Sequence, residues 1–167
     1  ARAYKARYPG IQVVCPSAAR KSVGKAVPVD GVFGAFDCPD GNSVTPRRSR
    51  SNTPLQALVL LNDPIFVEAA RVFAAHALTQ GGPSANAQIG WAFQRVTGRN
   101  ATLAELRVLN DLHAKSLARF QKDPASASEL LNVGDTAKPQ TLSPVRVAAM
   151  TTVTRAILNL HETITRN

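Results

Sequence analysis

The sequence predicts a mainly α domain, a bundle-like packing of five or six helices that follows an irregular, basic N-terminal segment. Three observations lead to this prediction. A Thr, Asp or Ser followed by proline occurs at four helix starts, and apolar residues after residue 53 recur at three- and four-residue spacing. Residues 1–46 are instead punctuated by glycine and proline. We therefore expect an irregular segment over 1–46, with a short hairpin at most, and a helical domain over 47–167.

Two helix starts lie close together in the first half of the chain. Thr53 and Gln56 form a predicted capping box, in which the Thr hydroxyl accepts from the Gln56 backbone and the Gln side chain reaches back to the Thr53 backbone. Asp63 precedes Pro64 and is a predicted N-cap. The expected helices cover 54–61 and 64–79. The second should bury one face, made of Phe66, Ala69, Ala70, Phe73 and Ala77.

Four more helices are expected in the second half of the chain. Ser84 is a predicted N-cap, and Gly98 is a predicted left-handed residue after a helix end. Thr102 and Glu105 form a second capping box, and Ser143 is a predicted N-cap before proline. A capping box is a local stabiliser worth about 1 kcal/mol and has no chemical role of its own. The expected ranges are the stretch between Ser84 and Gly98, 103–121, a short helix from Asp123-Pro124 to Gly134, and 144–165.

The 167 residues carry a net charge of +9 that is unevenly spread. Residues 1–52 hold nine Lys and Arg against three Asp, so this leading part alone contributes +6. Such a surface either binds an anionic partner or is simply solvated, and charge alone does not separate the two. No apolar stretch approaches the ~18 residues that a membrane span needs. The chain begins without Met, so we expect it to be part of a longer polypeptide.

The two cysteines, Cys15 and Cys38, lie 23 residues apart in the irregular segment. A disulfide between them would stabilise that segment by roughly 3 kcal/mol on the chain-entropy model. Neither cysteine sits in a C-x-x-C or C-x-x-C-H pattern, so no zinc site or covalent haem is indicated here. From the residues alone, a bonded pair and two free thiols are equally open.

Arg47, Arg48 and Arg50 stand directly before the first helix start and are the best binding candidates in the sequence. Guanidinium groups beside a helix N-terminus favour an anion, because the free N–H groups and the end of the helix dipole add to their charge. The alternative is structural, with the three arginines paired to Asp37, Asp40 and helix C-termini. We therefore treat the three arginines as a candidate anion site.

No residue pattern predicts a catalytic centre or a metal site. His113 and His161 are expected to face the core, where a backbone carbonyl satisfies a histidine more often than a metal or haem iron uses it as a ligand. His76 is expected near the exposed side of its helix. The sequence holds neither a G-x-S-x-G elbow nor a glycine-rich phosphate loop. Whether the segment belongs to an enzyme stays open.

Three segments resemble one known family. FDCPDGNSVTPRRSRSNTPLQALVLLNDPIFVEAARVFA (residues 36–74), IGWAFQRVTGRNATLAEL (89–106) and RAILNLHETITRN (155–167) are similar, in this order, to the C-terminal domain called DUF1553 or PSD1. The resemblance covers about residues 32–167. Residues 1–30 depart from the family pattern, and His161-Glu162 stands where Asp-Glu is usual, which argues against a catalytic carboxylate at that place.

The resemblance implies a larger exported protein of planctomycetes and related bacteria, with a DUF1549 domain and a cytochrome-c-like domain elsewhere in the polypeptide. An exported, periplasmic or cell-surface location would favour the Cys15–Cys38 disulfide and would make nucleic acid an unlikely partner. It implies no cofactor in this segment, with haem c on another domain or partner.

Two functions are therefore weighed. The favoured one is a non-catalytic structural or interaction module that packs against other domains or subunits of a larger exported, cytochrome-linked protein. The alternative is part of an exported enzyme that acts on an acidic or sulfated carbohydrate through the arginine-rich anion site. Nucleic-acid binding is supported by charge alone, and few aromatic residues accompany the basic ones.

Overall fold

A computed structural model describes residues 54–164, and these residues form α-helices joined by short connections, with no β-strand among them. The mainly α prediction is confirmed. The helices are α4 (Pro54–Asn62), α5 (Pro64–Gln80), α6 (Ala85–Thr97), α7 (Leu103–Lys122), α8 (Pro124–Leu131), α9 (Pro144–Leu158) and α10 (His161–Ile164). None of them is long and apolar enough to cross a membrane. The proposed hairpin pieces and the boundary at residue 46 lie outside the described residues.

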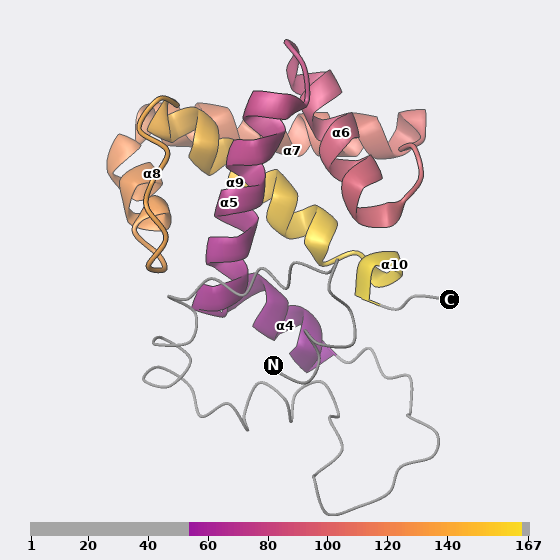
Figure 1. Cartoon of the computed structure of the whole chain (residues 1–167), viewed down its shortest axis with the longest axis horizontal. Helices are drawn as coiled ribbons and strands as arrows, with labels where there is room; N and C mark the ends of the chain where they lie inside the picture. Colours follow the sequence, from indigo (N-terminus) through magenta and orange to yellow (C-terminus); the bar gives the residue numbers. More distant parts are fainter. Residues whose placement is uncertain (1–53, 165–167) are drawn as a thin grey trace, which may run out of the picture.

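Helix α9 is the centre of the packing (Figure 1), and it contacts α5, α7 and α8 most extensively. Its side chains are buried nearly all round because helices cover it on several sides. The fully buried positions on α9 are Val147, Ala148, Ala149, Met150, Thr151, Val153, Thr154 and Ile157. Ile89 and Phe93 of α6, Phe120 of α7 and Leu131 of α8 belong to the same core.

The last helix is shorter than the range 144–165 that the apolar spacing predicted. Helix α9 ends at Leu158, and the Asn159 backbone N–H is shared between the carbonyls of Arg155 and Ala156. The Thr163 hydroxyl then donates to the Ile157 carbonyl, which satisfies one of the open acceptors at the helix end. Because the chain turns here, His161 begins a separate one-turn helix and is exposed, so its predicted inward position was wrong.

The buried face of α5 is rotated from the one we predicted. Ala70 and Ala77 are buried as expected, whereas Ala69 is exposed and Phe66 and Phe73 are only half-buried. Helix α9 instead approaches the side where small residues let the two backbones come close, and the Thr154 hydroxyl donates to the Ala70 carbonyl at 2.9 Å. The residues buried on α5 are Val67, Glu68, Ala70, Arg71, Ala74, Ala77 and Leu78.

Candidate functional site

The residues singled out at the N-terminal side fall mostly outside the described part of the chain. Arg47, Arg48 and Arg50, both cysteines Cys15 and Cys38, and the cap residue Thr53 all precede residue 54. Gln56, the other half of the first capping box, lies in α4 and is 2% exposed. The anion site and the disulfide therefore stay predictions.

Of the remaining predicted caps, side chains form those of α5, α6 and α7, and in α6 the Ala87 N–H donates to Ser84 Oγ at 3.2 Å. The Ile65 backbone N–H donates to Asp63 Oδ1 at 2.9 Å. The capping box of α7 has both of its bonds, since the Glu105 N–H donates to Thr102 Oγ1 and the Thr102 N–H donates to Glu105 Oε2. Ser143 stands at the predicted N-cap position of α9, but its side chain makes no cap hydrogen bond. Pro144 starts the helix without it, because the fixed φ of proline is already helical.

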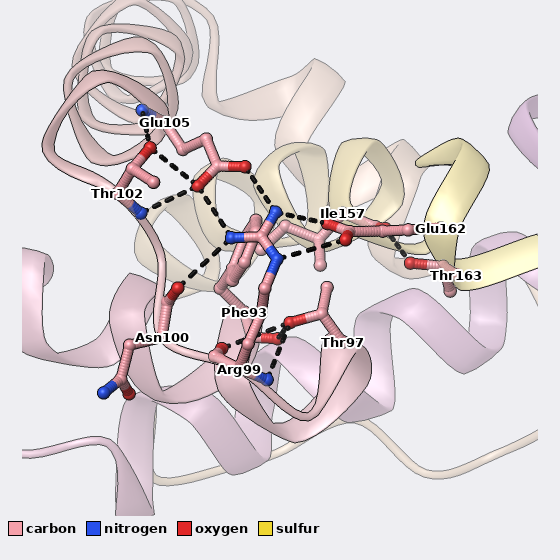
Figure 2. Close-up of polar contacts among 9 residues, drawn as sticks. All are labelled: Phe93, Thr97, Arg99, Asn100, Thr102, Glu105, Ile157, Glu162 and Thr163. Carbon is pink, nitrogen blue, oxygen red and sulfur yellow. Dashed lines mark hydrogen bonds and ion pairs between the residues drawn. The ribbon is translucent and has the colours of Figure 1, made fainter. Parts of the chain in front are cut away.

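The most connected polar group among the described residues is the guanidinium of Arg99 (Figure 2). Its Nε and Nη2 donate to the two carboxylate oxygens of Glu162, at 3.1 and 2.8 Å. Its Nη1 and Nη2 donate to the two oxygens of Glu105, at 3.0 and 2.6 Å. Nη1 also donates to the Asn100 carbonyl at 3.2 Å. Arg99, Glu105 and Glu162 are called the Arg99 clasp below.

The clasp uses the full donor capacity of one arginine. A guanidinium has five N–H donors in a planar fork, and the five contacts of Arg99 match that number. Both carboxylates are held in the bidentate geometry that an arginine favours. The result is a direct bond between the connection of α6 to α7, the first turn of α7, and α10.

Local backbone structure places Arg99 between its two partners. Helix α6 ends at Gly98, whose φ of 78° lies in the left-handed region that glycine adopts without strain. The turn brings Arg99 back over the end of α6, where its guanidinium carbon lies 4.9 Å from the centre of the Phe93 ring. Phe93 itself is buried in the core. The arginine is thus stacked on an aromatic face on one side and paired with carboxylates at its edges.

The electrostatics of the clasp keep its charges fixed. The hydrogen bond from Arg99, followed by those from the Thr102 backbone and side chain, lowers the pKa of Glu105 to about 2. Hydrogen bonds to Glu105 and Glu162 raise the pKa of Arg99 above its usual value. A carboxyl group whose pKa lies this far below neutral pH is poorly suited to transfer protons, because a general acid or base works best with a pKa near the operating pH. The role that the Arg99 clasp fits is structural, since it joins the start of α7 to α10.

A second polar contact holds the connection between α8 and α9 onto α5. The Thr136 backbone N–H donates to Glu68 Oε1 at 2.5 Å, and Arg71 Nη2 donates to the Thr136 carbonyl at 2.7 Å. Burial acts to raise the pKa of Glu68, but hydrogen bonds from Thr136 and the Asp135 backbone, with the charge of Arg71, outweigh it and lower that pKa. Arg71 is 1% exposed, and its Nε and Nη1 have no hydrogen-bond partner. The Arg71 guanidinium holds the Thr136 segment in place, but burying its charge costs desolvation free energy.

A third arginine links α9 to α4. Arg155 Nη2 donates to the carbonyl of Leu61 in the last turn of α4, and α4 has no basic residue of its own in that turn. Burial lowers the pKa of Arg155. Its Nε is buried without a hydrogen-bond partner. As with Arg71, the side chain is directed at a backbone carbonyl of a neighbouring segment.

The histidines do not gather into a site. His76 is exposed on α5, as predicted, and its ring lies 3.3 Å from the Gln80 amide. His113 is half-buried, and burial together with the charge of Arg146 lowers its pKa. Within residues 54–164 no group of three or more His, Cys, Asp or Glu is placed to hold a metal ion. His113 is therefore a single titratable group against the core.

A small cavity lies beside the connection between α8 and α9. Its volume is about 100 Å³, and its lining is mostly apolar. Leu131, Leu142 and Val147 form its walls, and Lys138 lies at its edge. A cavity of this size accommodates a few water molecules or one small apolar group, far less than the usual 300–1,000 Å³ of a ligand pocket.

The Arg99 clasp was not predicted from the sequence. Glu105 was identified only as a cap, Glu162 was considered only where it departs from the family pattern, and Arg99 was not singled out. Yet Arg99 and Glu105 lie in one of the family-like segments, and Glu162 lies in another. Opposite charges that lie in two family-like segments far apart in the chain are what a structural ion-pair network requires.

A family described as "PSD1: Protein of unknown function (DUF1553)" matches residues 19–113, more than half of the chain. No curated protein and no solved structure matches.

Proposed function

The chain belongs to the PSD1 (DUF1553) family, and from this we propose that it is a non-catalytic structural and interaction module of a larger exported, cytochrome-linked protein. Haem c would lie on another domain or partner. The observation that carries the proposal is the Arg99 clasp, which uses the best-connected charged group of the described residues to join three segments. Arg71 and Arg155 are used in the same way.

The outer face of α7 is the surface we propose for docking. Leu103 is 77% exposed and Val108 69% exposed, and they are two of the three large apolar side chains that the described residues expose. The same outer face carries four basic side chains, Arg107, Lys115, Arg119 and Lys122, against one acidic side chain, Asp111. A partner surface with acidic and apolar residues would complement both properties. We therefore propose an acidic surface of the larger protein as the occupant.

The test uses the native, full-length protein or complex. A zero-length carbodiimide reagent joins lysine to carboxylate groups in direct contact, so it suits the proposed acidic partner. We expect peptides containing Lys115 or Lys122 to be linked to Asp or Glu of another domain or subunit. Lys138, which is exposed in the connection before α9, serves as the matched control and should give no such link.

The contrary results are equally specific. Links from Lys138 without links from Lys115 and Lys122 would contradict the proposed docking face. Binding of a sulfated oligosaccharide that is lost in the Arg47→Ala, Arg48→Ala, Arg50→Ala variant would favour the carbohydrate enzyme instead.

The exported location is part of the proposal and has its own measurement. In an oxidising compartment Cys15 and Cys38 should be joined, since the periplasm sustains disulfides. Protein recovered from the native cell envelope and alkylated without reduction should carry no label on either cysteine. Full labelling of both thiols would argue for a reducing compartment.

A further inference from the structure

Helix α4 is almost entirely apolar, yet part of it is exposed to solvent. Apart from Gln56 and Asn62, every residue of α4 from Pro54 to Asn62 is apolar. The one fully buried side chain described on this helix is nevertheless Gln56, and Leu58 is 57% exposed. A helix that is apolar on all sides is normally buried on all sides. Figure 1 shows α4 at the edge of the packing, beyond the end of α5.

We propose that residues 27–36 of the same chain pack on the exposed side of α4. This stretch, VPVDGVFGAF, is the most apolar part of the basic leading segment and carries Val32, Phe33 and Phe36. Helix α4 contains no charged residue, and residues 27–36 contain only one, Asp30. The inference concerns contacts within the chain and does not depend on the proposed function.

Two further observations select this occupant. The 17 residues between Phe36 and Pro54 could extend to about 55 Å, whereas α4 is only about 13 Å long, so the tether allows the contact. The family match covers residues 19–113, so residues 27–36 and α4 both lie within the matched part of the chain.

Hydrogen exchange in the full chain tests the contact. A nine-residue helix is marginal by itself in water, so tertiary packing must protect its amides. In the variant Phe33→Asp, Phe36→Asp we expect the amides of residues 57–62 to exchange at least about tenfold faster, relative to those of α9, than in the parent chain. The matched control is Ile11→Asp, Val13→Asp, which places the same two charges in another apolar stretch of the leading segment and should change nothing.

The remaining outcomes all count against the proposal. An unchanged exchange ratio in Phe33→Asp, Phe36→Asp would show that these residues do not cover α4. An equal acceleration of α4 and α9 would show a general loss of stability instead of a local contact. Protection of α4 that rises with protein concentration would identify a second copy of the chain as the occupant. The milder variant Phe33→Ala, Phe36→Ala repeats the test without introducing charge.

Discussion

Three arginines connect segments that are far apart in the sequence. Arg99 reaches from the end of α6 to α10, Arg71 from α5 to the connection before α9, and Arg155 from α9 to α4. Arginine suits this role because its planar fork offers several donors in fixed directions and remains charged at any physiological pH. The three differ in exposure, from 1% for Arg71 to 43% for the Arg99 side chain.

The clasp gives the first prediction. In Arg99→Lys the charge is kept, but an ammonium has three donors and no planar fork, so it cannot serve both carboxylates and the Asn100 carbonyl. We expect the amides of Thr163 and Ile164 in α10 to exchange faster and Tm to fall by a few degrees. Hydrogen exchange and thermal unfolding measure the two effects.

A matched control makes that prediction specific. Arg107→Lys applies the same substitution at an exposed position of α7 and should leave both quantities unchanged. Lys115→Ala removes an exposed pair with Asp111, whose atoms are 2.7 Å apart, and should also have no measurable effect. If Arg99→Lys behaved like these two variants, charge alone would explain the clasp and the bidentate geometry would be unimportant.

The second prediction compares caps that the sequence could not tell apart. Thr102→Ala and Asp63→Ala each remove a side-chain hydrogen bond to a helix N-terminus and should lower the free energy of unfolding by about 1 kcal/mol. Ser143→Ala removes no such bond and should cost less than about 0.5 kcal/mol. Urea unfolding of the three variants provides the comparison, and equal losses would mean that Ser143 does form a cap.

At the level of the helices, starts were predictable and faces were not. Proline with a preceding cap residue marks a start locally, and α4, α5, α8 and α9 all begin at that proline. Which side of α5 is buried depends on where α9 lies, and α9 is over 60 residues away. Phe73, predicted on the buried face, is only half-buried and lies beside Trp91 of α6, with ring centres 5.9 Å apart.

Helix ends and charged contacts were harder to predict for a related reason. The break after Leu158 is made by backbone and Thr163 hydrogen bonds, while the apolar spacing continues through it. The clasp depends on Gly98 turning the chain so that Arg99 meets Glu162, which is 63 residues away. Contacts between residues so far apart in the chain depend on the packed fold, and the apolar periodicity within one helix does not predict them.

The third prediction concerns the connection between α8 and α9. Gly134 has φ +88°, and a Cβ at this position would come within 2.3 Å of the Glu68 carboxyl. Gly134→Ala should therefore destabilise the protein by about 1–3 kcal/mol through backbone strain and the clash. Glu68→Ala should cost about 2–3 kcal/mol because a buried carboxylate that accepts from Thr136 is lost.

The double variant separates strain from clash. Gly134→Ala with Glu68→Ala lacks the carboxyl that the new Cβ would meet, so its loss of unfolding free energy should be smaller than the two single losses added together. Denaturant unfolding of the four chains gives the cycle. Strict additivity would mean that the cost of Gly134→Ala comes only from its φ and that Glu68 moves aside freely.

In the whole molecule, apolar packing is concentrated on α9 and the polar contacts lie around it. Helices α5, α7 and α8 bury α9, while the Arg99 clasp and the Arg71 contact fix segments at opposite ends of this packing. Figure 1 shows α8 and α10 at those two ends. The core therefore supplies most of the stability, and the charged contacts set where α10 and the connection before α9 lie.

The dependence of stability on pH is the fourth prediction and belongs to the whole molecule. His113 has a pKa below the usual 6.5, because of burial and then the charge of Arg146, so the unfolded chain binds its proton more readily. The free energy of unfolding should begin to fall as the pH drops below about 6.5. In His113→Leu this first decline should disappear. Guanidinium unfolding from pH 8 to pH 5 measures it, and an identical decline in both chains would assign it elsewhere.

A second decline should follow at lower pH, because carboxylates with lowered pKa values stabilise the fold only while ionised. Glu68, Glu105 and Asp123 all have such values, each through hydrogen bonds that the native structure supplies. For Glu105 the contribution is complete above about 4.5 and is lost progressively towards about 2. Glu105→Gln should flatten the part of the curve below pH 4.5 and leave the His113 decline intact. Because the two declines arise from different residues, His113→Leu should remove the first and preserve the second, and Glu105→Gln should reduce the second and preserve the first. A variant that abolished both would show that they share a single cause.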